Sequence, residues 1–198
     1  MPSIDRMRPQ PDDRLAFFQG FLRKPMQVGS IIPSSRFLER RIARAAGIER
    51  ARLVVELGPG TGGTTRALLR QMRPDALLLA IEIDPDFVSV LRRLNHDARL
   101  IVHEGSATEV SQILAKHELG APDVVLSGIP FSTMTRPMGR EILRSVHDAL
   151  EPGGVFVASQ VRDRVNIPGT EVFGRAQTDT VLLNVPPMRV YRWEKQAR

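Results

Sequence analysis

The stretch that decides the fold is Leu53-Val54-Val55-Glu56-Leu57-Gly58-Pro59-Gly60-Thr61-Gly62-Gly63-Thr64-Thr65, followed by Ala80-Ile81-Glu82-Ile83-Asp84-Pro85. An apolar run ends in Glu56, breaks into a glycine turn and continues as a helix, and the next apolar run ends in Glu82. Glycines let the backbone approach a ligand closely, and the free N–H groups of a helix start offer that ligand polar contacts. A carboxylate at the end of the second strand can accept both hydroxyl hydrogens of a ribose. The pattern therefore predicts the nucleoside-binding first half of a parallel α/β sheet.

The same glycines fit two kinds of cofactor. Gly58, Gly60 and Gly63 satisfy the G-x-G-x-x-G pattern of dinucleotide-binding proteins. Glu56, two residues before the first glycine, suits the cationic amino end of S-adenosylmethionine better than a pyrophosphate. The E-x-G-x-G-x-G arrangement resembles the first motif of the class I methyltransferases, with a nicotinamide or flavin dinucleotide as the alternative. The residues predicted to contact S-adenosylmethionine are Glu56, Gly58, Pro59, Gly60, Thr61, Gly62, Glu82, Ile83, Gly105, Ser106, Ala107 and Ser127.

Composition narrows the chemistry and the partners. The 198 residues include no cysteine, which excludes disulfides and thiolate sites, and the four histidines lack metal-ligand spacing, so no metal is predicted. No apolar run reaches the roughly 20 residues that cross a bilayer, and the first residues do not resemble a signal peptide. The net charge of +6 points to nucleic acid or an anionic lipid surface, with an inert basic surface as the alternative.

Alternating apolar runs and helical patterns predict a doubly wound sheet. A second helix, over 36–46 and capped by serines of the preceding loop, leads into the alternating units. Strands are expected at 53–56, 77–82, 100–103, 124–127 and 155–160, with helices at 63–72, 85–94, 109–117 and 137–150. Two further strand-like runs, 178–183 and 188–193, predict a closing antiparallel hairpin and a seven-stranded, Rossmann-like sheet. The polar segment 162–169 is expected to be a loop, either a lid or a mobile connection.

The N-terminal segment predicts an amphipathic helix over Asp12–Lys24 that either packs on the domain or lies in a membrane interface. We expect an N-terminal arm over 1–30 and a catalytic domain over 31–198. The residues predicted to meet the membrane are Arg14, Leu15, Phe17, Phe18, Phe21, Leu22, Arg23 and Lys24.

The end of the fourth strand, Leu126-Ser127-Gly128-Ile129-Pro130-Phe131-Ser132, is the stretch most informative about the substrate. A proline followed by an aromatic residue predicts a rigid turn that offers carbonyl groups and an exposed Phe131 ring to the nitrogen that is methylated. Methyltransferases that modify the adenine amine carry an Asn-Leu-Pro-Tyr type tetrad here, and the first side chain accepts a hydrogen bond from that amine. Gly128 has no acceptor, which argues against adenine.

Four segments together resemble the bacterial phospholipid N-methyltransferases, over about Phe17 to Trp193. They are Gly29–Leu38, the Glu-Leu-Gly-Pro-Gly-Thr-Gly motif, Ser127–Ser132 and Asn184–Tyr191. The resemblance implies stepwise methylation of phosphatidylethanolamine toward phosphatidylcholine. It also implies a cytoplasmic enzyme, peripheral on the inner membrane, whose N-terminal helix binds anionic lipid.

Methyl transfer needs a neutral nitrogen lone pair aimed at the methyl carbon, so the protein mainly positions the amine and excludes water. Pro130 and Phe131 are predicted to frame the amine, and Tyr191 or the carbonyl groups of Ser127 and Gly128 are candidate helpers in its deprotonation, with solvent as the alternative. Candidate contacts to the lipid are Ser30, Ser34, Ser35, Arg36, Arg189 and Arg192.

Two other functions compete with this interpretation. The positive charge and the Ile-Pro-Phe turn also suit a ribosomal RNA adenine N6-methyltransferase. The few aromatic residues and Gly128 argue against it, and we do not expect the extra C-terminal domain that such enzymes typically carry. The second rival is a non-catalytic membrane-binding protein with the same fold. We expect a monomer that takes a phospholipid rather than nucleic acid.

Overall fold

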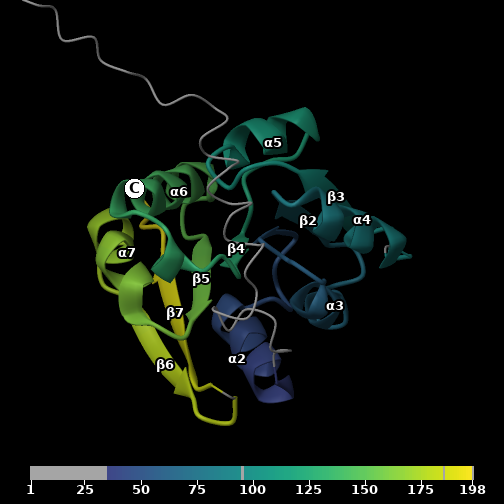
Figure 1. The fold of residues 1–198 in the computed structure, drawn as a ribbon. Coiled ribbons are helices and arrows are strands. Elements are labelled where there is room, and N and C mark those ends of the chain that lie inside the picture. The colour runs from purple at the N-terminus through teal and green to yellow at the C-terminus, as the bar shows by residue number, and fades with distance from the viewer. Residues whose placement is uncertain (1–34, 95, 185, 198) are drawn as a thin grey trace, which may run out of the picture. The chain divides into compact units, whose positions relative to one another are not determined.

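The computed structural model describes residues 35–94, 96–184 and 186–197 (Figure 1). Several predictions lie outside the described residues. They are the helix over 12–24 with its membrane contacts, the boundary between residues 30 and 31, and the lipid contacts Ser30 and Ser34. No helix of the described ranges is both long and apolar enough to span a bilayer.

One sheet of seven strands organises the chain, in the order β3-β2-β1-β4-β5-β7-β6 (Figure 1). The strands are β1 Leu53–Leu57, β2 Leu77–Glu82, β3 Leu100–Glu104, β4 Val124–Ser127, β5 Val155–Gln160, β6 Gln177–Val181 and β7 Met188–Glu194. The helices are α2 Arg36–Ala46, α3 Gly63–Leu69, α4 Pro85–Leu94, α5 Val110–Lys116, α6 Arg136–Ala149 and α7 Asn166–Phe173, with short 3-10 helices η2 Phe131–Thr133 and η3 Asp163–Val165.

The first five strands are parallel, and β7 runs antiparallel to both β5 and β6. The predicted doubly wound sheet and its closing hairpin are therefore confirmed. Strands covered on both faces read as nearly continuous apolar runs, as β1 and β2 do, because every side chain enters a core. Near their ends Glu56 and Glu82 break that rule, and both carboxylates are buried.

Each face of the sheet has its own core. On one face α2 and α3 cover a cluster of aliphatic side chains that includes Leu38, Val54 and Val190. On the other face Phe156 stacks on both Phe173 and Trp193, with ring centroids 5.6 Å and 5.5 Å apart, and Tyr191 continues the stack.

The prediction of a loop over 162–169 is wrong, because the structure forms η3 and α7 there. Asn-Ile-Pro-Gly reads locally as a turn, yet Pro168 falls in the first helical turn, where a missing N–H does no harm. A Cβ on Gly169 would lie only 2.4 Å from Cζ2 of Trp193. Close packing of this helix on the indole ring, which a local pattern does not encode, decides the conformation.

The start of α2 is capped as expected. The Ser35 side chain accepts a hydrogen bond from the Leu38 N–H at 3.2 Å. Its own N–H donates to Oδ1 of Asn184 at 3.0 Å, which joins this helix start to the turn between β6 and β7.

Candidate active site

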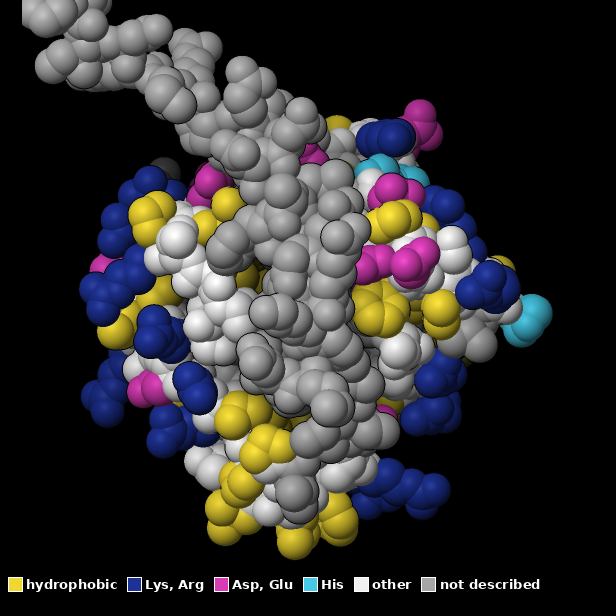
Figure 2. Space-filling model, in the orientation of Figure 1, with side chains coloured by type: hydrophobic (Ala, Val, Ile, Leu, Met, Phe, Trp, Pro, Cys, Tyr) yellow, Lys and Arg dark blue, Asp and Glu magenta, His cyan; other side chains and the backbone are white. Residues whose placement is uncertain are grey.

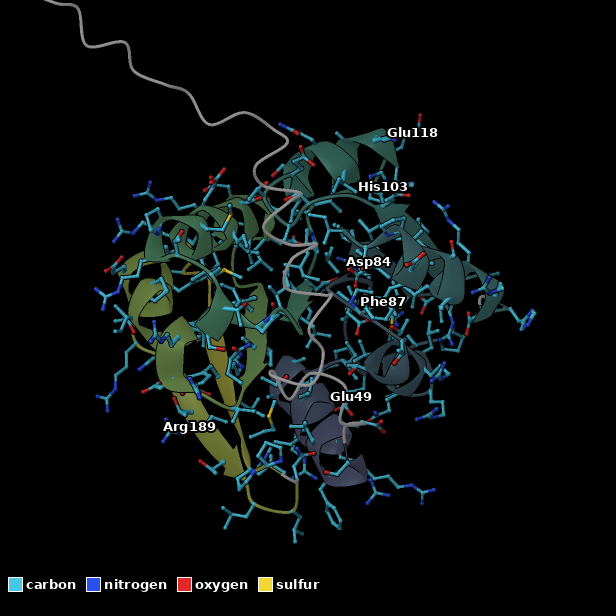
Figure 3. All side chains as sticks on the ribbon, in the orientation of Figure 1. Glu49, Asp84, Phe87, His103, Glu118 and Arg189 are labelled. Atoms are coloured by element: carbon cyan, nitrogen blue, oxygen red, sulfur yellow. The ribbon has the colours of Figure 1, made fainter. Side chains whose placement is uncertain are left out.

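Four loops meet at the edge of the sheet where the parallel strands end, which is where ligands bind in open α/β sheets. They follow β1, β2, β3 and β4, and they contain most of the residues predicted from the sequence. Figure 3 shows Asp84 and Phe87 close together where β2 leads into α4, with Arg189 well away from them on β7.

The loop after β1 requires its glycines. The backbone angle φ is +68° at Gly58 and +77° at Gly62, in the region that side chains disfavour. A Cβ on Gly62 would also lie 2.9 Å from Cδ2 of Leu91. Gly62 is the N-cap of α3, and its N–H donates to the carbonyl of Pro59 at 3.0 Å. The turn is thus held by backbone contacts, with Thr61 exposed at its tip.

Glu82 fastens this glycine turn to the second strand. Its carboxylate accepts hydrogen bonds from the N–H groups of Gly60 at 3.0 Å, Ile83 at 2.9 Å and Asp84 at 3.1 Å. Burial raises the pKa of Glu82 above its usual value, and these hydrogen bonds oppose the rise. A buried carboxylate with donors converging on it is well placed to accept hydroxyl hydrogens beside the turn.

Glu56 lies on β1 with its side chain toward α3. It is only 3% exposed, and its Oε2 accepts a hydrogen bond from the Thr65 hydroxyl at 2.7 Å. Burial raises the pKa of Glu56 to about 7, with a smaller rise from the charge of Glu82 and an opposing effect from Thr65. A cationic group brought next to Glu56 would favour the ionised carboxylate. The sequence interpretation missed Thr65, although its place one helical turn after the glycines was a usable signal.

A small cleft of about 40 Å³ brings the end of β1 together with the end of β4. Its lining residues are Ile42, Glu56, Gly58, Pro59, Thr64, Leu126, Ser127, Gly128, Val157 and Ser159. The structure therefore places Glu56, the glycine turn and the predicted acceptor turn around one space.

The loop after β3 adjoins the same edge, since the Gly105 N–H donates to the carbonyl of Glu82 at 2.9 Å. Ser106 is already engaged within this loop, because its Oγ lies 2.8 Å from Oγ1 of Thr108 and accepts the Thr108 N–H at 3.2 Å. Ala107 is 9% exposed. The Ser106 hydroxyl, predicted to contact the cofactor, therefore also makes hydrogen bonds within its own loop.

Tight backbone packing shapes the turn after β4. The Gly128 N–H donates to the carbonyl of Leu57 at 2.9 Å, and a Cβ at Gly128 would lie 2.9 Å from the carbonyl oxygen of Gly58. Ser127 is buried, and its Oγ accepts the Ile129 N–H at 3.2 Å. Any side chain at position 128 would press on the glycine turn after β1, which gives a physical reason for the departure from an asparagine.

The expectation of an exposed Phe131 ring is wrong. The residue is 3% exposed and packs beside Gly139 of α6 and Met134. Gln160, at the end of β5, holds the backbone on either side of Pro130: its Nε2 donates to the carbonyl of Ile129 at 2.8 Å and its Oε1 accepts the Phe131 N–H at 3.2 Å. The signal for Gln160 was present, because like Glu82 it is a polar residue that ends an apolar strand.

A cavity of about 600 Å³ opens beside this turn, between η2, η3, α6 and α7. Apolar groups line part of it, and three exposed arginines and Asp163 contribute charge. The lining residues are Phe131, Met134, Thr135, Arg136, Gly139, Arg162, Asp163, Arg164, Ile167 and Pro168. The sequence did not predict this cavity, because a loop was expected over 162–169, where η3 and α7 line it.

A family model described as a methyltransferase domain matches residues 54–154, more than half of the chain. The chain belongs to the methyltransferase domain family. The matched segment runs from β1 to the turn before β5 and so contains all four loops of the site. The cofactor of this methyltransferase is S-adenosylmethionine, as the glycine turn predicted.

Two curated relatives differ in what their names say they methylate. An ornithine lipid N-methyltransferase from Singulisphaera acidiphila is 35% identical over 145 residues, which cover 73% of this chain and 76% of that protein. A ribosomal RNA small subunit methyltransferase A from Maricaulis maris is 38% identical over 146 residues, which cover 70% of this chain and 47% of that protein. The chain therefore spans about half the length of the ribosomal RNA relative.

Among solved structures, human N-acetylserotonin methyltransferase in complex with S-adenosylmethionine superposes with a TM-score of 0.63. The match covers 95% of this chain and 57% of that chain at 13% sequence identity. A likeness at this identity shows a shared fold, and it agrees with the sheet topology described above.

Several residues predicted for the acceptor side of the methyltransferase have other partners. The Tyr191 hydroxyl donates to Oδ1 of Asp163 at 2.5 Å, and burial and this carboxylate raise the pKa of Tyr191 to about 12. A hydroxyl that already donates to a carboxylate and has a raised pKa is poorly suited to take a further proton. Arg192 lies on the other face of the sheet, where it donates to the carbonyl of Ala45 and pairs with Glu194.

Of the other residues predicted to contact lipid, one lies beside the cavity and two lie at the start of α2. Arg189 lies 3.7 Å from the Asp163 carboxylate and so adjoins the cavity. Arg36 is exposed at the start of α2, and Ser35 serves as the helix cap. The structure thus brings Arg189 next to the cavity and gives Arg192 and Ser35 structural contacts.

Two of the histidines lie next to each other in the structure. Nδ1 of His103 lies 2.9 Å from Nε2 of His117, joining the end of β3 to α5. Among the residues that the structure describes, no group of three or more histidine, aspartate or glutamate side chains is arranged to hold a metal ion.

Proposed function

We propose that this methyltransferase transfers a methyl group from S-adenosylmethionine to the amine of a zwitterionic lipid. Phosphatidylethanolamine is the proposed first acceptor, and its mono- and dimethyl forms are the next two. The observation that carries the proposal is the cavity beside Pro130 and Phe131, whose apolar wall and arginine rim suit an amphiphile with an anionic headgroup. The name of the Singulisphaera acidiphila relative supports an aminolipid acceptor.

The cofactor supplies a methyl group on a sulfonium. Glu56 would face the ammonium of its methionine part, because a buried carboxylate beside a helix start needs a cationic partner to ionise fully. Glu82 would accept the ribose hydroxyls in exchange for part of its hydrogen bonding to the glycine turn. Gly105, Ser106 and Ala107 would line the adenine.

On the acceptor side, the protein positions an amine at the turn after β4. Gln160 fixes the backbone around Pro130, so the turn is preorganised before substrate arrives. The carbonyl groups of Ser127 and Gly128 would accept hydrogen bonds from the amine, and Phe131 would form the cavity wall. Solvent takes the proton that the ammonium must lose, because Tyr191 is itself a donor.

Arg136, Arg162 and Arg164 would receive the anionic group of the headgroup, phosphate in phosphatidylethanolamine and carboxylate in an ornithine lipid. Asp163 is the one carboxylate among the cavity's described lining residues, and the Tyr191 hydroxyl and Arg189 already engage it. The cavity rim therefore carries a net positive charge.

The test is transfer of a labelled methyl group to defined acceptors presented in mixed micelles. Phosphatidylethanolamine and monomethylphosphatidylethanolamine should be labelled, and phosphatidylglycerol, which has no amine, should not. The double variant Arg136→Gln/Arg164→Gln should raise KM for the lipid about tenfold or more, with little change in kcat. Arg50→Gln, which changes an exposed arginine in the turn before β1, is the matched control. If none of the aminolipids is labelled, the proposal is overturned. If only ornithine lipid is labelled, ornithine lipid replaces phosphatidylethanolamine as the acceptor.

The 38% identity to a ribosomal RNA methyltransferase favours adenine as a second candidate acceptor. Gly128 opposes it, because the backbone contact with Gly58 leaves no room for an amine-accepting side chain. Adding small-subunit ribosomal RNA to the same assay decides between them: labelled RNA together with unlabelled lipid would reverse the ranking.

A further inference from the structure

Large apolar side chains are exposed at one end of the described structure. Leu182 is 73% exposed, Leu183 is 65% exposed and Phe37 is 55% exposed. Figure 2 shows hydrophobic side chains gathered at the lower end of the molecule, where Figure 1 places the turn between β6 and β7. We call Phe37, Leu182 and Leu183 the apolar tip.

Strand direction fixes which edge of the sheet the apolar tip occupies. Both β5 and β6 are antiparallel to β7 and therefore run the same way. Gln160 at the end of β5 pairs with Arg189, and Val181 at the end of β6 pairs with Met188. Residues 182–184, which follow β6, thus lie beyond the carboxyl edge, the same edge that holds the cofactor loops and the acceptor turn.

The apolar tip is held firmly to the body. The Asn184 side chain is buried, accepts the Ser35 N–H at 3.0 Å and donates to the carbonyl of Pro186 at 2.8 Å. Arg41 of α2 pairs with Asp179 of β6 at 2.5 Å. These contacts join the two segments that carry the tip, so its exposed side chains project from fixed backbone.

Exposed basic side chains of α2 flank the apolar tip. Arg40 and Arg44 follow Phe37 at helical spacing, and both are exposed, as is Arg36. The nearby acidic groups are neutralised, since Asp179 pairs with Arg41 and Glu39 pairs with Arg70 at 3.7 Å. Apolar side chains flanked by exposed arginines match the interface of an anionic bilayer.

We propose that the apolar tip inserts into the interface of an anionic membrane while the arginines of α2 contact its headgroups. This places the carboxyl edge of the sheet against the lipid surface, so that an acceptor amine enters the site from the bilayer. The inference rests on the proposed lipid acceptor only for this consequence, since insertion itself requires no turnover.

The experiment uses the full chain, which has no cysteine, so one introduced cysteine carries a unique environment-sensitive fluorophore. Leu183→Cys places it in the tip, and Glu151→Cys places it in the exposed turn before β5, at the opposite edge of the sheet. Vesicles are an equal mixture of phosphatidylglycerol and phosphatidylcholine, or phosphatidylcholine alone. With the anionic vesicles, the label at 183 should shift to the blue and be quenched by brominated lipid, whereas the label at 151 should do neither.

Exchanging both leucines for serine should reduce binding to the anionic vesicles about tenfold and leave S-adenosylmethionine binding unchanged. Vesicle binding without a spectral shift at 183 overturns the inference, because another segment then makes the contact. A shift that grows with protein concentration in the absence of vesicles also overturns it, in favour of a second copy of the chain. Insertion without methyl transfer to lipid refutes the proposed acceptor alone, and transfer without insertion refutes the apolar tip alone.

Discussion

At the scale of single residues, the cofactor side depends on two buried carboxylates with different surroundings. Glu82 receives three backbone N–H groups, whereas the one hydrogen bond described for the Glu56 side chain comes from Thr65. Both are polar residues at or near the ends of otherwise apolar strands, and that contrast made them visible in the sequence. The positions of Thr65 and Gln160 were also informative, but the groups to which they bond, the Glu56 side chain and the Phe131 backbone, are brought near only in the folded chain.

Cofactor binding should depend on pH through Glu56. Its pKa is raised to about 7, so the carboxyl is mostly protonated at pH 6 and ionised at pH 8. If the ionised form holds the cofactor ammonium, binding releases a proton, and the dissociation constant should fall about tenfold between these pH values. Calorimetry in two buffers of different ionisation enthalpy measures both the affinity and the proton release. Glu56→Gln should bind more weakly and lose the pH dependence; a flat profile in the unmodified protein would exclude this role.

Removing the Glu82 carboxylate should abolish S-adenosylmethionine binding measured by calorimetry. Glu82→Ala leaves the N–H of Gly60 in the glycine turn, and those of Ile83 and Asp84 after β2, without their acceptor. The free energy of unfolding should therefore also fall by about 1–3 kcal/mol. Glu104→Ala is the matched control, because Glu104 pairs with Glu82 in the sheet register and is exposed. Equal cofactor affinity in the two variants would mean that Glu82 does not face the ligand.

At the scale of elements, buried strands were predictable because their apolar runs are short, continuous and bounded by turns. The helix α7 was not, because Pro168 and Gly169 resemble a turn and the face that covers the sheet is set by Trp193. Because α7 was not predicted, the cavity that we assign to the acceptor was not predicted either, since η3 and α7 line much of it.

The packing of α7 can be tested at Gly169. A methyl group there would lie 2.4 Å from the Trp193 ring, so Gly169→Ala should displace the helix and lower the free energy of unfolding by about 1–3 kcal/mol. Denaturant unfolding followed by intrinsic fluorescence reports the site directly, because the chain has a single tryptophan. Gly120→Ala, where an added Cβ meets nothing within 4 Å, should change stability little. An unchanged unfolding midpoint for Gly169→Ala would contradict the packing described here.

At the scale of the whole molecule, the net charge of +6 favours anionic partners but does not indicate which kind. Both an anionic membrane and an RNA would be attracted. The distribution of charge is more informative, because arginines border both the cavity and the apolar tip at the carboxyl edge.

If this charge guides the protein to lipid, vesicle binding should weaken with salt. Raising the ionic strength from about 0.05 M to about 0.5 M shortens the screening length severalfold and should reduce binding to phosphatidylglycerol vesicles about tenfold. Sedimentation with the vesicles measures the bound fraction, and phosphatidylcholine vesicles provide the uncharged control. Binding that is equally strong at both salt concentrations would assign the interaction to apolar contacts alone.

The position of β7 between β5 and β6 bears on how the protein is made. Because β7 follows β6 in the chain, β6 has no neighbour to pair with until the seventh strand leaves the ribosome. Tyr191 and Trp193, which hold Asp163 and complete the aromatic stack, arrive with that strand. The cofactor cradle can therefore assemble during translation, whereas the cavity beside Phe131 is finished only after β7 has been synthesised.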